Sequence, residues 1–497
     1  MTKYLIAIDQ GTTSTRSILF DNQGKIVVIE KVEHAQIYPQ PGWVEHNPLE
    51  ILHNTRLTLE RVIEKSSVPI KDILGIGITN QRETTILWDK DTGIPVSNAI
   101  VWQDTRTAKI CQVYKSEIGD DFFRKITGLP ISTYFSAPKI KYMLDNNPDI
   151  KNRFLMNKIF FGTMDTWLIW NLTGGPSGGL YMTDVTNASR TMLFNINTLE
   201  WDQSLLDIFG IQIEILPKVV CSSQYIGYAQ LPFGSLPIAG ILGDQQAALF
   251  GQNCFQTGQA KNTYGTGCFI LMNTGDNPVP SKHGLITTIA YQLENQPAQY
   301  CLEGSIAITG AVVRWLRDNL QIIKTSSEVE SLAQQVEDNG GVYFVPAFSG
   351  LFAPYWRSDA RGIIIGLSHH TTSAHIARAA LESTAYQTMD VITAMELDSG
   401  INLSLLKVDG GMTQNTLLMQ FQSDILGKKL VKPKITETTA LGAAYVVGIA
   451  LGVWNSIREL QEILQEDITF IPEMAENVRS DLTQNWKNAV LRTLNWI

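Results

Sequence analysis

The chain has 497 residues, of which 44% are hydrophobic and 18% charged, and its formal net charge is −9. This length is too great for one ordinary domain and indicates two or three, while the composition excludes a disordered or fibrous chain. Acidic and basic residues are mixed without a basic block, so nucleic acid is not an expected partner, although a local nest of amides with one or two cations can still bind an anionic cofactor.

The first half of the chain opens with short alternating segments that predict strands. Three of them are expected, at residues 4–9, 16–21 and 25–30. A polar turn separates the first two, and Asn22-Gln23-Gly24 forms a hairpin turn before the third. A helix is expected over 48–65 with Asn47 as its N-cap, and then a strand over 73–79. Antiparallel strands followed by alternating helix and strand predict an α/β domain with a mixed sheet.

The second half repeats this order of elements. Strands are expected at 236–242, 259–272 (interrupted by a turn), 342–347, 362–367 and 405–409, and a long helix at 372–397. One Gly-Thr turn lies between strands in each half, which indicates a duplicated domain, although such turns are common. We place the domain boundary near residue 250, giving an N-terminal domain over 1–250 and a C-terminal domain over 251–497.

The cysteines and the apolar stretches indicate a cytoplasmic protein. Five cysteines are scattered without a CxxC pair, at Cys111, Cys221, Cys254, Cys268 and Cys301. This pattern fits a reducing compartment and indicates neither a disulfide framework nor a zinc site. The apolar stretch at the N-terminus is too short for a signal-peptide core. The longest weakly polar stretch, near 440–454, is shorter than the roughly 18 residues that span a membrane, so we expect a buried helix there.

A turn rich in hydroxyls follows the first predicted strand, with the sequence DQGTTSTR at residues 9–16. Backbone amides in a glycine turn can point into a concavity that suits phosphate, and the hydroxyls and Arg16 add donors and a cation. Asp9 stands where it could hold Mg²⁺ directly or through water. The alternative is an ordinary β-hairpin with Thr- and Ser-rich strands. The chain has no GxxxxGK[ST] sequence, so this turn is not a Walker A loop.

An adjacent arginine and glutamate, Arg82 and Glu83, follow the strand at 73–79. A hydroxyl group both donates and accepts hydrogen bonds, so a cationic donor beside an anionic acceptor is suited to a polyol. The alternative is a surface ion pair, which is the commoner meaning of an isolated Arg-Glu pair.

The sequence Gly243-Asp244-Gln245 joins a strand end to a helix of small residues. Asp244 can act as a general base that accepts the proton of a substrate hydroxyl as a phosphoryl group arrives. The alternative is a helix N-cap. Two further glycine motifs, YGTG at 264–267 and VDGGMTQN at 408–415, would let the backbone approach a ligand closely.

Five motifs in this order resemble those of the FGGY carbohydrate kinases, from the N-terminus to near the C-terminus. They are DQGTTSTR (9–16), NQRET (80–84), GDQQAALFGQ (243–252), YGTGCF (264–269) and DGGMTQN (409–415). Residues 134–146 and 362–382 also match longer family patterns, with Tyr142 at a position that is usually Trp. The resemblance implies two RNase H-like α/β domains around a central cleft, as in actin and hexokinase.

The resemblance also implies an activity and a set of site residues. The activity is ATP-dependent phosphorylation of glycerol to sn-glycerol 3-phosphate, in glycerol catabolism and glycerolipid precursor supply. The residues matching the family's substrate site are Arg82, Glu83, Trp102, Tyr134, Asp244, Gln245 and Phe269, with Asp244 catalytic. Those matching the ATP site are Thr12, Thr13, Ser14, Arg16, Thr266, Gly310, Arg314, Gly411 and Asn415, and Asp9 and Asp244 are the expected Mg²⁺ residues. The polyol site and phosphate turn then belong to the N-terminal domain, and most nucleotide contacts to the C-terminal domain.

Two departures from the family pattern concern the nucleotide and regulation. Arg314 stands where relatives often have Gln, four residues after Gly310 on the same face of a predicted helix. Residues 222–237 lack both the GKGGTR-like loop that binds a sugar bisphosphate in some bacterial relatives and the histidine that accepts phosphate from the phosphotransferase system in others.

Two alternative functions remain open at this stage. A pentulose or other sugar kinase of the same family is disfavoured because such relatives usually carry a different motif in place of Arg82-Glu83. An actin-like or chaperone-like ATP switch would need partner-binding insertions or an appended domain. The sequence is compatible with a homodimer or a homotetramer.

Overall fold

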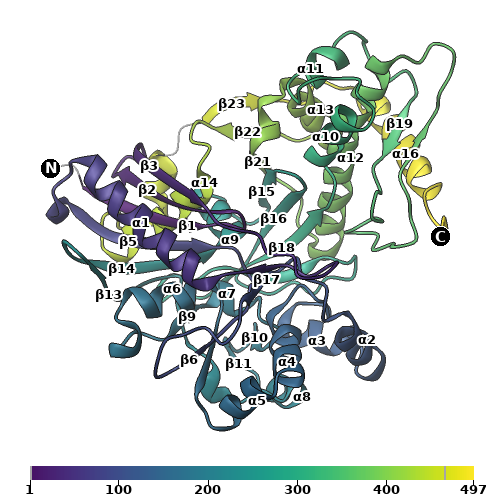
Figure 1. Ribbon diagram of the computed structural model, residues 1–497. Helices are drawn as coiled ribbons and strands as arrows, with labels where there is room; N and C mark the ends of the chain where they lie inside the picture. The colour runs from purple at the N-terminus through teal and green to yellow at the C-terminus, as the bar shows by residue number, and fades with distance from the viewer. Residues whose placement is uncertain (1–2, 464–465) are drawn as a thin grey trace.

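The computed structural model describes residues 3–463 and 466–497, which form two α/β halves, each with one large sheet (Figure 1). The six-stranded sheet has the order β13-β14-β5-β1-β2-β3, and the seven-stranded sheet has the order β17-β18-β16-β15-β21-β22-β23. The predicted domains 1–250 and 251–497 include residues 1–2 and 464–465, which lie outside the described residues.

The strands of each large sheet come from separate parts of the chain, with helices between some of them. The six-stranded sheet comprises β1 (Tyr4–Gln10), β2 (Ser14–Asp21), β3 (Ile26–Glu33), β5 (Ile73–Asn80), β13 (Ser223–Leu231) and β14 (Gly234–Gly243). The seven-stranded sheet comprises β15 (Gln259–Tyr264), β16 (Cys268–Gly275), β17 (Ile286–Tyr291), β18 (Gln299–Ile306), β21 (Leu405–Asp409), β22 (Leu430–Pro433) and β23 (Glu466–Phe470). Small two-stranded pairs are β4 (Glu45–His46) with β7 (Ala99–Ile100), β6 (Ile86–Asp89) with β8 (Ile159–Gly162), β9 (Met182–Asp184) with β12 (Lys218–Val220), β10 (Phe194–Asn195) with β11 (Glu200–Trp201), and β19 (Tyr343–Val345) with β20 (Ile363–Ile365).

The helices cover both large sheets and build the lower part of the first half in Figure 1. In the first half they are α1 (Pro48–Ser66), α2 (Ala108–Glu117), α3 (Asp120–Thr127), α4 (Ser136–Asn146), α5 (Pro148–Leu155), α6 (Met164–Leu172), α7 (Val185–Ala188), α8 (Gln203–Phe209) and α9 (Asp244–Gly251). In the second half they are α10 (Gly310–Asp318), α11 (Glu328–Ala333), α12 (Ser373–Ser399), α13 (Thr416–Leu426), α14 (Thr438–Ala450), α15 (Ile457–Ile463) and α16 (Glu476–Leu491).

The two large sheets share one pattern of neighbours, which confirms the predicted duplication. In the first, β1 is antiparallel to β2 and parallel to β5, β2 is antiparallel to β3, and β5 is parallel to β14, with β13 as an antiparallel edge. In the second, β15 is antiparallel to β16 and parallel to β21, β16 is antiparallel to β18, and β21 is parallel to β22, with β23 antiparallel to it. The two Gly-Thr turns therefore occupy equivalent places, between β1 and β2 and between β15 and β16.

Two helices cross at the junction of the halves. Helix α14 follows β22 of the second half but packs on β1, β5 and β14 of the first, where the yellow-green helix lies beside the purple strands in Figure 1. It also packs along α9. A Cβ atom on Gly442 would lie 1.9 Å from the carbonyl oxygen of Ala247, and one on Gly251 would lie 2.0 Å from that of Thr438. Glycine at both positions therefore lets the helix backbones touch.

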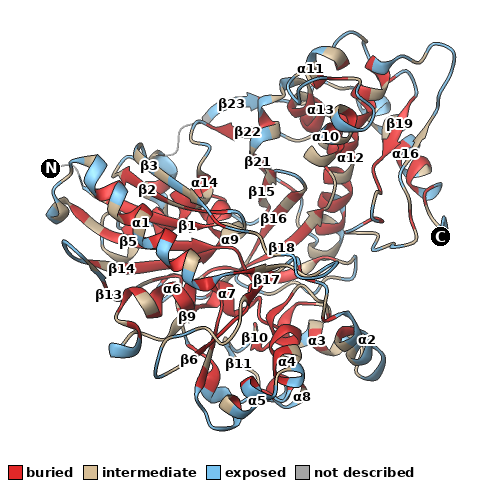
Figure 2. Cartoon of the chain, viewed as in Figure 1, coloured by how far each residue is buried: buried red, intermediate tan, exposed pale blue. Residues whose placement is uncertain are grey.

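The hydrophobic core is continuous across this crossing. One cluster of buried side chains joins Leu5 and Phe20 of the first sheet to Leu441 and Tyr445 of α14 and to Leu271 of the second sheet. Figure 2 shows the strands of both large sheets as mostly buried, with exposed residues on the outer helix faces. The packing of α9 on α14 thus holds the two halves together. The predicted site motifs follow the carboxyl ends of β1, β5, β14, β15 and β21.

Most predicted elements of the chain are confirmed with small shifts of their ends. Asn47 caps α1, since its Oδ1 accepts a hydrogen bond from Leu49 N at 3.0 Å. Most of the buried helix α14 lies within the weakly polar stretch near 440–454, where a buried helix was predicted. Across the described ranges, no helix combines the length and apolar character that crossing a bilayer requires.

Candidate active site

Arg82 and Glu83 lie in the turn that follows β5, and both side chains are only 1% exposed. The surface ion pair considered from the sequence is therefore wrong. Glu83 has φ = 61°, in the left-handed region that is uncommon for a residue with a side chain. Its carbonyl oxygen accepts hydrogen bonds from Ser136 Oγ and Thr85 Oγ1, both at 3.0 Å. Such a conformation persists where its surroundings hold it, and it is typical of functional sites.

These two residues and two further buried side chains, Arg190 and Glu303, form a ring of alternating charge, called here the charge ring. Arg82 donates to both carboxylate oxygens of Glu303, at 2.5 and 3.0 Å. Arg190 donates from Nε to Glu83 at 2.6 Å and from Nη2 to Glu303 at 3.1 Å. Arg82 Nε lies 3.9 Å from Glu83 Oε1 and closes the ring. Since Glu303 lies on β18 and the other three residues on the first half, the ring also joins the halves.

The ring has no net formal charge, and its members differ in their electrostatic surroundings. Burial disfavours the charged form of Glu303, but Arg190 and Arg82 outweigh that effect and lower its pKa to about 2. Burial raises the pKa of Glu83, which the two arginines only partly oppose. Burial likewise raises the pKa of the nearby Tyr134 phenol well above its usual range. The site thus holds fixed charges in surroundings from which water is largely excluded.

Asp244 is the first residue of α9, and the position of the N-cap belongs to Gly243. The N-cap interpretation of Asp244 is therefore wrong. Its Oδ1 lies 3.1 Å from Arg82 Nε, and its side chain is 30% exposed whereas that of Arg82 is 1% exposed. Asp244 therefore lies on the open side of the charge ring. The next residue, Gln245, accepts a hydrogen bond through Oε1 from Lys261 Nζ, on β15 of the second half.

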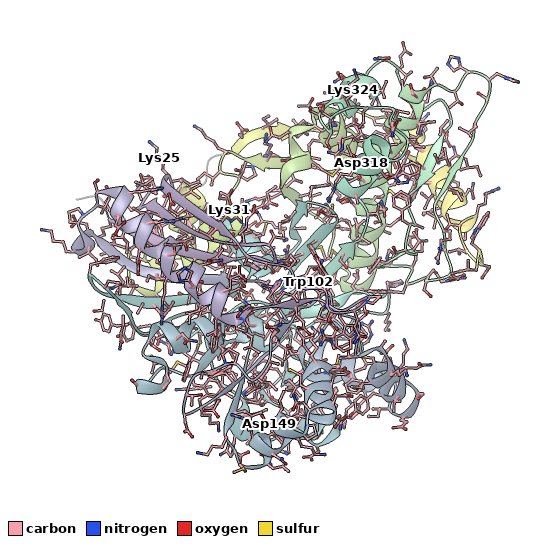
Figure 3. The ribbon with its side chains drawn as sticks, in the orientation of Figure 1. Lys25, Lys31, Trp102, Asp149, Asp318 and Lys324 are labelled. Carbon is pink, nitrogen blue, oxygen red and sulfur yellow. The ribbon has the colours of Figure 1, made fainter. Side chains whose placement is uncertain are left out.

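Three aromatic rings lie together beside this cluster. The ring of Trp102 packs edge to face against Tyr134 at 5.4 Å and against Phe269 at 6.4 Å between centroids. Figure 3 labels Trp102 in the region where the two halves meet. Trp102 Nε1 also donates to Thr12 Oγ1 at 3.0 Å, so the aromatic wall contacts the hydroxyl-rich turn. The predicted polyol residues therefore come together from both halves of the chain.

The hydroxyl-rich turn is closed by a hydrogen bond from Gly11 N to Ser14 O at 2.9 Å. Thr13 is exposed at its tip, Thr12 is half-buried and Ser14 is buried. Gln36 Nε2 donates to the carbonyl oxygen of Thr12 at 2.9 Å and supports the turn from behind. The turn therefore presents threonine hydroxyls and backbone at its surface.

Arg16 at the end of this turn already has two carboxylate partners. It forms ion pairs with Asp9 and, at 2.5 Å, with Glu437, which precedes α14. Burial raises the pKa of Asp9, an effect that Arg16 opposes and that the charges of Glu437 and Asp244 reinforce. The carboxylates of Asp9, Glu437 and Asp244 are therefore close enough to interact. The described ranges contain no group of three His, Cys, Asp or Glu side chains placed to hold a metal ion by themselves.

The predicted nucleotide residues of the second half lie on three turns that dock on one another through backbone. Gly310 N donates to Gly265 O at 3.1 Å, and Thr309 N donates to Thr266 O at 3.0 Å. A Cβ atom on Gly410, which has φ = 92°, would lie 2.3 Å from Tyr264 O. By contrast, a Cβ atom on Gly411 would meet nothing within 4 Å. The turns are thus packed against each other on one side and open at Gly411.

The two remaining predicted nucleotide residues, Arg314 and Asn415, lie in this second group, and Asp409 lies near them in the DGG motif. Arg314, exposed on α10, donates from Nη2 to Thr266 Oγ1, so it lies beside another predicted nucleotide residue. Asn415 caps α13, since its Oδ1 accepts from Leu418 N at 2.8 Å. Asp409, at the end of β21, accepts from Gln252 Nε2 at 2.8 Å and from Thr438 Oγ1, while its buried Oδ1 has no partner.

Sequence reasoning missed four charged residues of this region: Arg190, Lys261, Glu303 and Glu437. Each lies outside the glycine motifs, and each contacts its partner across more than ten residues of sequence. The one available signal is a single charged residue within a strand, since Glu303 is the one charged residue of β18 and Lys261 the one charged residue of β15.

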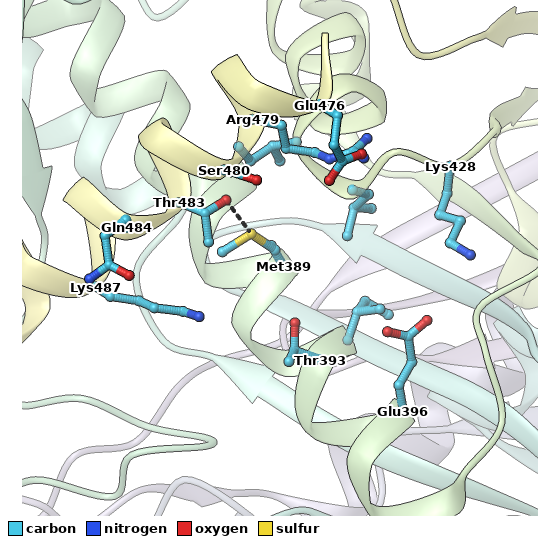
Figure 4. Close-up of a pocket in the computed structure, with 13 residues that line it drawn as sticks. Met389, Thr393, Glu396, Lys428, Glu476, Arg479, Ser480, Thr483, Gln484 and Lys487 are labelled. Atoms are coloured by element: carbon cyan, nitrogen blue, oxygen red, sulfur yellow. Dashed lines mark hydrogen bonds and ion pairs between the residues drawn. The ribbon is translucent and has the colours of Figure 1, made fainter. Parts of the chain in front are cut away.

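A hollow of about 410 Å³ lies elsewhere, between α12, α13 and α16 (Figure 4). Met389, Ile392 and Leu426 contribute apolar surface to it, and Lys428 and Lys487 contribute cations. None of the predicted site residues lines this hollow.

Family models match both halves of the chain. The model for the FGGY family of carbohydrate kinases, N-terminal domain, matches residues 4–251, and that for the C-terminal domain matches residues 260–451. The chain therefore belongs to the FGGY family of carbohydrate kinases.

Individual relatives within this family are similar to the chain over its whole length. The chain is 56% identical over 497 residues to a protein named glycerol kinase from Chloroflexus aggregans, covering 100% of both chains. It superposes on the crystal structure of Plasmodium falciparum glycerol kinase with ADP at a TM-score of 0.94, with 41% identity over 99% of this chain and 98% of that one. A gluconate kinase from Lactobacillus acidophilus shares the fold at a TM-score of 0.88, with 23% identity over 98% of this chain and 97% of that one.

Proposed function

We propose that this chain transfers the γ-phosphoryl group of ATP to a terminal hydroxyl of glycerol and releases sn-glycerol 3-phosphate and ADP. The observation that carries the proposal is the buried charge ring of Arg82 and Glu83 beside Asp244, with the rings of Trp102, Tyr134 and Phe269 next to it. A triol offers hydroxyls to the charged groups and carbon–hydrogen faces to the rings. Whole-chain identity to proteins named glycerol kinase supports this choice of substrate.

The proposed mechanism follows from the positions of these groups. Arg82 and Gln245 donate hydrogen bonds to hydroxyl oxygens of glycerol, and Glu83 accepts one from a hydroxyl group. Asp244 takes the proton from the attacking hydroxyl of glycerol. The oxygen of that hydroxyl forms the new bond to the γ-phosphorus, and the bond between this phosphorus and the oxygen that leaves with ADP breaks. The charged side chains of Arg82, Glu83, Arg190 and Glu303 are already fixed in low-dielectric surroundings, so they need little reorganisation during the reaction. The aromatic wall excludes water, so water competes less with glycerol as the acceptor of the phosphoryl group.

We assign the nucleotide to the three docked turns of the second half, with its phosphates reaching Thr12, Thr13 and Arg16. The open space at Gly411 fits a ligand that approaches the backbone, and Arg314 adds a cation suited to an anionic partner. Mg²⁺ bound with ATP would neutralise charge on the phosphate oxygens. Asp9 and Asp244 would hold it, directly or through water. The ion pairs of Arg16 with Asp9 and Glu437 support this placement, because they mark a region of the chain that is rich in carboxylates.

The proposal also assigns the two sites to the two domains and includes the cellular location and the oligomeric state. Residues 1–250 supply the polyol site and phosphate turn, and residues 251–497 supply most of the nucleotide site, with the boundary near residue 250. A cytoplasmic location is supported by five cysteines that are all free, four of them buried. Assembly as a homodimer or homotetramer is a proposal that light scattering on the purified protein tests.

A coupled ADP-release assay with glycerol, with xylulose and with no acceptor tests the proposed function. We expect turnover with glycerol far above that with xylulose and far above the acceptor-free rate. A higher specificity constant for xylulose would indicate a sugar kinase of the same family. Equal ADP release with and without an acceptor would indicate an ATP switch instead.

A further inference from the structure

Lys261 is a buried lysine that links the second sheet to the candidate polyol site. It lies on β15, its side chain is fully buried, and its Nζ donates to Gln245 Oε1 and, at 3.1 Å, to Thr263 Oγ1. Gln245 lies in the first turn of α9, next to Asp244. A cation of the second half therefore holds a predicted substrate-binding side chain of the first half.

The chemistry of the lysine fixes the orientation of the glutamine amide. A lysine ammonium carries only donors, whereas a glutamine amide has an acceptor oxygen and a donor nitrogen. Lys261 therefore requires Oε1 of Gln245 to face it and leaves Nε2 to donate. We propose that Lys261 is a positioning residue for substrate specificity, which fixes Gln245 as a hydrogen-bond donor to a hydroxyl oxygen of the polyol. This inference rests on the proposed function, since it assumes a polyol bound beside Asp244.

The charges around Lys261 explain how a fully buried ammonium group is retained there. Asp409 of β21, Asp244 of α9 and Glu303 of β18 favour its charged form, and Arg82 opposes it. Burial lowers the pKa of Lys261 to about 8, and those three carboxylates limit the fall. The three carboxylates therefore favour the ammonium form of Lys261, which only donates hydrogen bonds.

The neighbouring strand provides a matched control, because Lys407 of β21 pairs with Lys261 in the register of the two parallel strands. Lys407 is also buried and also reaches α9, but at the opposite end of the helix. Its Nζ donates to the carbonyl oxygens of Gln252 at 2.6 Å and Asn253 at 3.4 Å. Replacing either lysine removes one buried cation from the same junction, yet only Lys261 contacts a predicted substrate residue.

The test compares Lys261→Met and Lys407→Met in the full chain, by steady-state kinetics with glycerol and ATP. Loss of one hydrogen bond to the substrate corresponds to roughly a 2–13-fold change. We therefore expect Lys261→Met to raise the KM for glycerol by about 3–10-fold, with the KM for ATP unchanged and kcat nearly so. Lys407→Met should lower the melting temperature and leave the KM for glycerol unchanged.

A double-mutant cycle with Gln245→Ala decides whether Lys261 acts through Gln245. If it does, adding Lys261→Met to Gln245→Ala should raise the KM for glycerol no further. Additive effects on that KM, an equal rise in both KM values, or a large fall in kcat alone would each overturn the proposal. Failure of the unmutated chain to phosphorylate glycerol would instead overturn the proposed function, so the two failures are distinguishable.

Discussion

The polyol end and the nucleotide end of the candidate site differ in how much of their geometry the chain supplies before a ligand binds. At the polyol end, Arg82, Glu83, Arg190 and Glu303 are buried and hold one another through charged hydrogen bonds. At the nucleotide end, Arg314 is exposed and the turns contact one another mainly through backbone. A small uncharged substrate makes few contacts, so its recognition depends on groups that are already ordered. A nucleotide offers more contacts and can order part of its own site.

The largest effect is expected from Asp244→Asn, which removes the proposed base from the rigid end without changing the size of the side chain. Turnover with glycerol should fall roughly 10²–10⁴-fold, because that is the usual contribution of a positioned general base. Nucleotide affinity and melting temperature should stay close to those of the unmutated protein. Single-turnover rates and calorimetric ATP titration measure these quantities, and turnover like that of the unmutated protein would remove Asp244 from the mechanism.

Arg82→Ala should produce the next largest effect, and it should separate the two ends of the site. We expect the KM for glycerol to rise about 10–150-fold, the range for losing a charged hydrogen bond of about 1.5–3 kcal/mol, and the KM for ATP to change far less. The melting temperature should also fall, because Glu303 loses its two hydrogen bonds from Arg82 and keeps only the one from Arg190. Arg82→Lys keeps the cation and should give an intermediate KM. Equal changes in both KM values would indicate a purely structural role.

The sequence predicted the motifs of both ends but not the side chains that order the polyol end. Asp244 and Arg82 follow strands directly, so local sequence gives both their identity and their place at a sheet edge. Glu303 contacts Arg82 across 221 residues, and nothing near residue 303 indicates that its carboxylate faces a guanidinium group. The left-handed conformation of Glu83 is likewise set by contacts with Ser136 and Lys139 of α4, which no local pattern contains.

A smaller effect is expected from Arg314→Gln at the exposed nucleotide end. ATP affinity should fall about 2–5-fold at low salt, as for other exposed charged contacts, and the difference should shrink at high salt because exposed charges are screened. Arg317→Gln on the same helix is the control, since Arg317 pairs with Asp318 at 2.6 Å. Fluorescence titration with an ATP analogue at two salt concentrations measures both variants. Unchanged affinity of Arg314→Gln at both would assign Arg314 to the helix surface.

No effect is expected from fructose 1,6-bisphosphate at millimolar concentration with saturating ATP. Residues 222–240, which form most of the β13–β14 hairpin at the sheet edge, contain no Lys, Arg or His. A bisphosphate needs fixed cations and amide donors, so one glycine turn without a cation should bind it weakly. Saturable inhibition of glycerol phosphorylation would show a bisphosphate site in another part of the chain.

The phosphocarrier of the phosphotransferase system should not activate this protein either. The β13–β14 hairpin offers no imidazole that could accept phosphate. Mass spectrometry after incubation with the phosphorylated carrier checks this expectation. A phosphohistidine accompanied by increased activity would contradict it.

The crossing of α9 and α14 has a consequence for the exchange of segments between related kinases. Since α14 of the second half completes the core beneath β1 and β5 of the first, a chimera joined near residue 250 would bring together a helix and a sheet from different parents. Gly442 and Gly251 leave no room at that contact for a larger residue from either parent. Such a hybrid should fold only where both surfaces match, and the unmutated chain should unfold in one cooperative transition although it contains two domains.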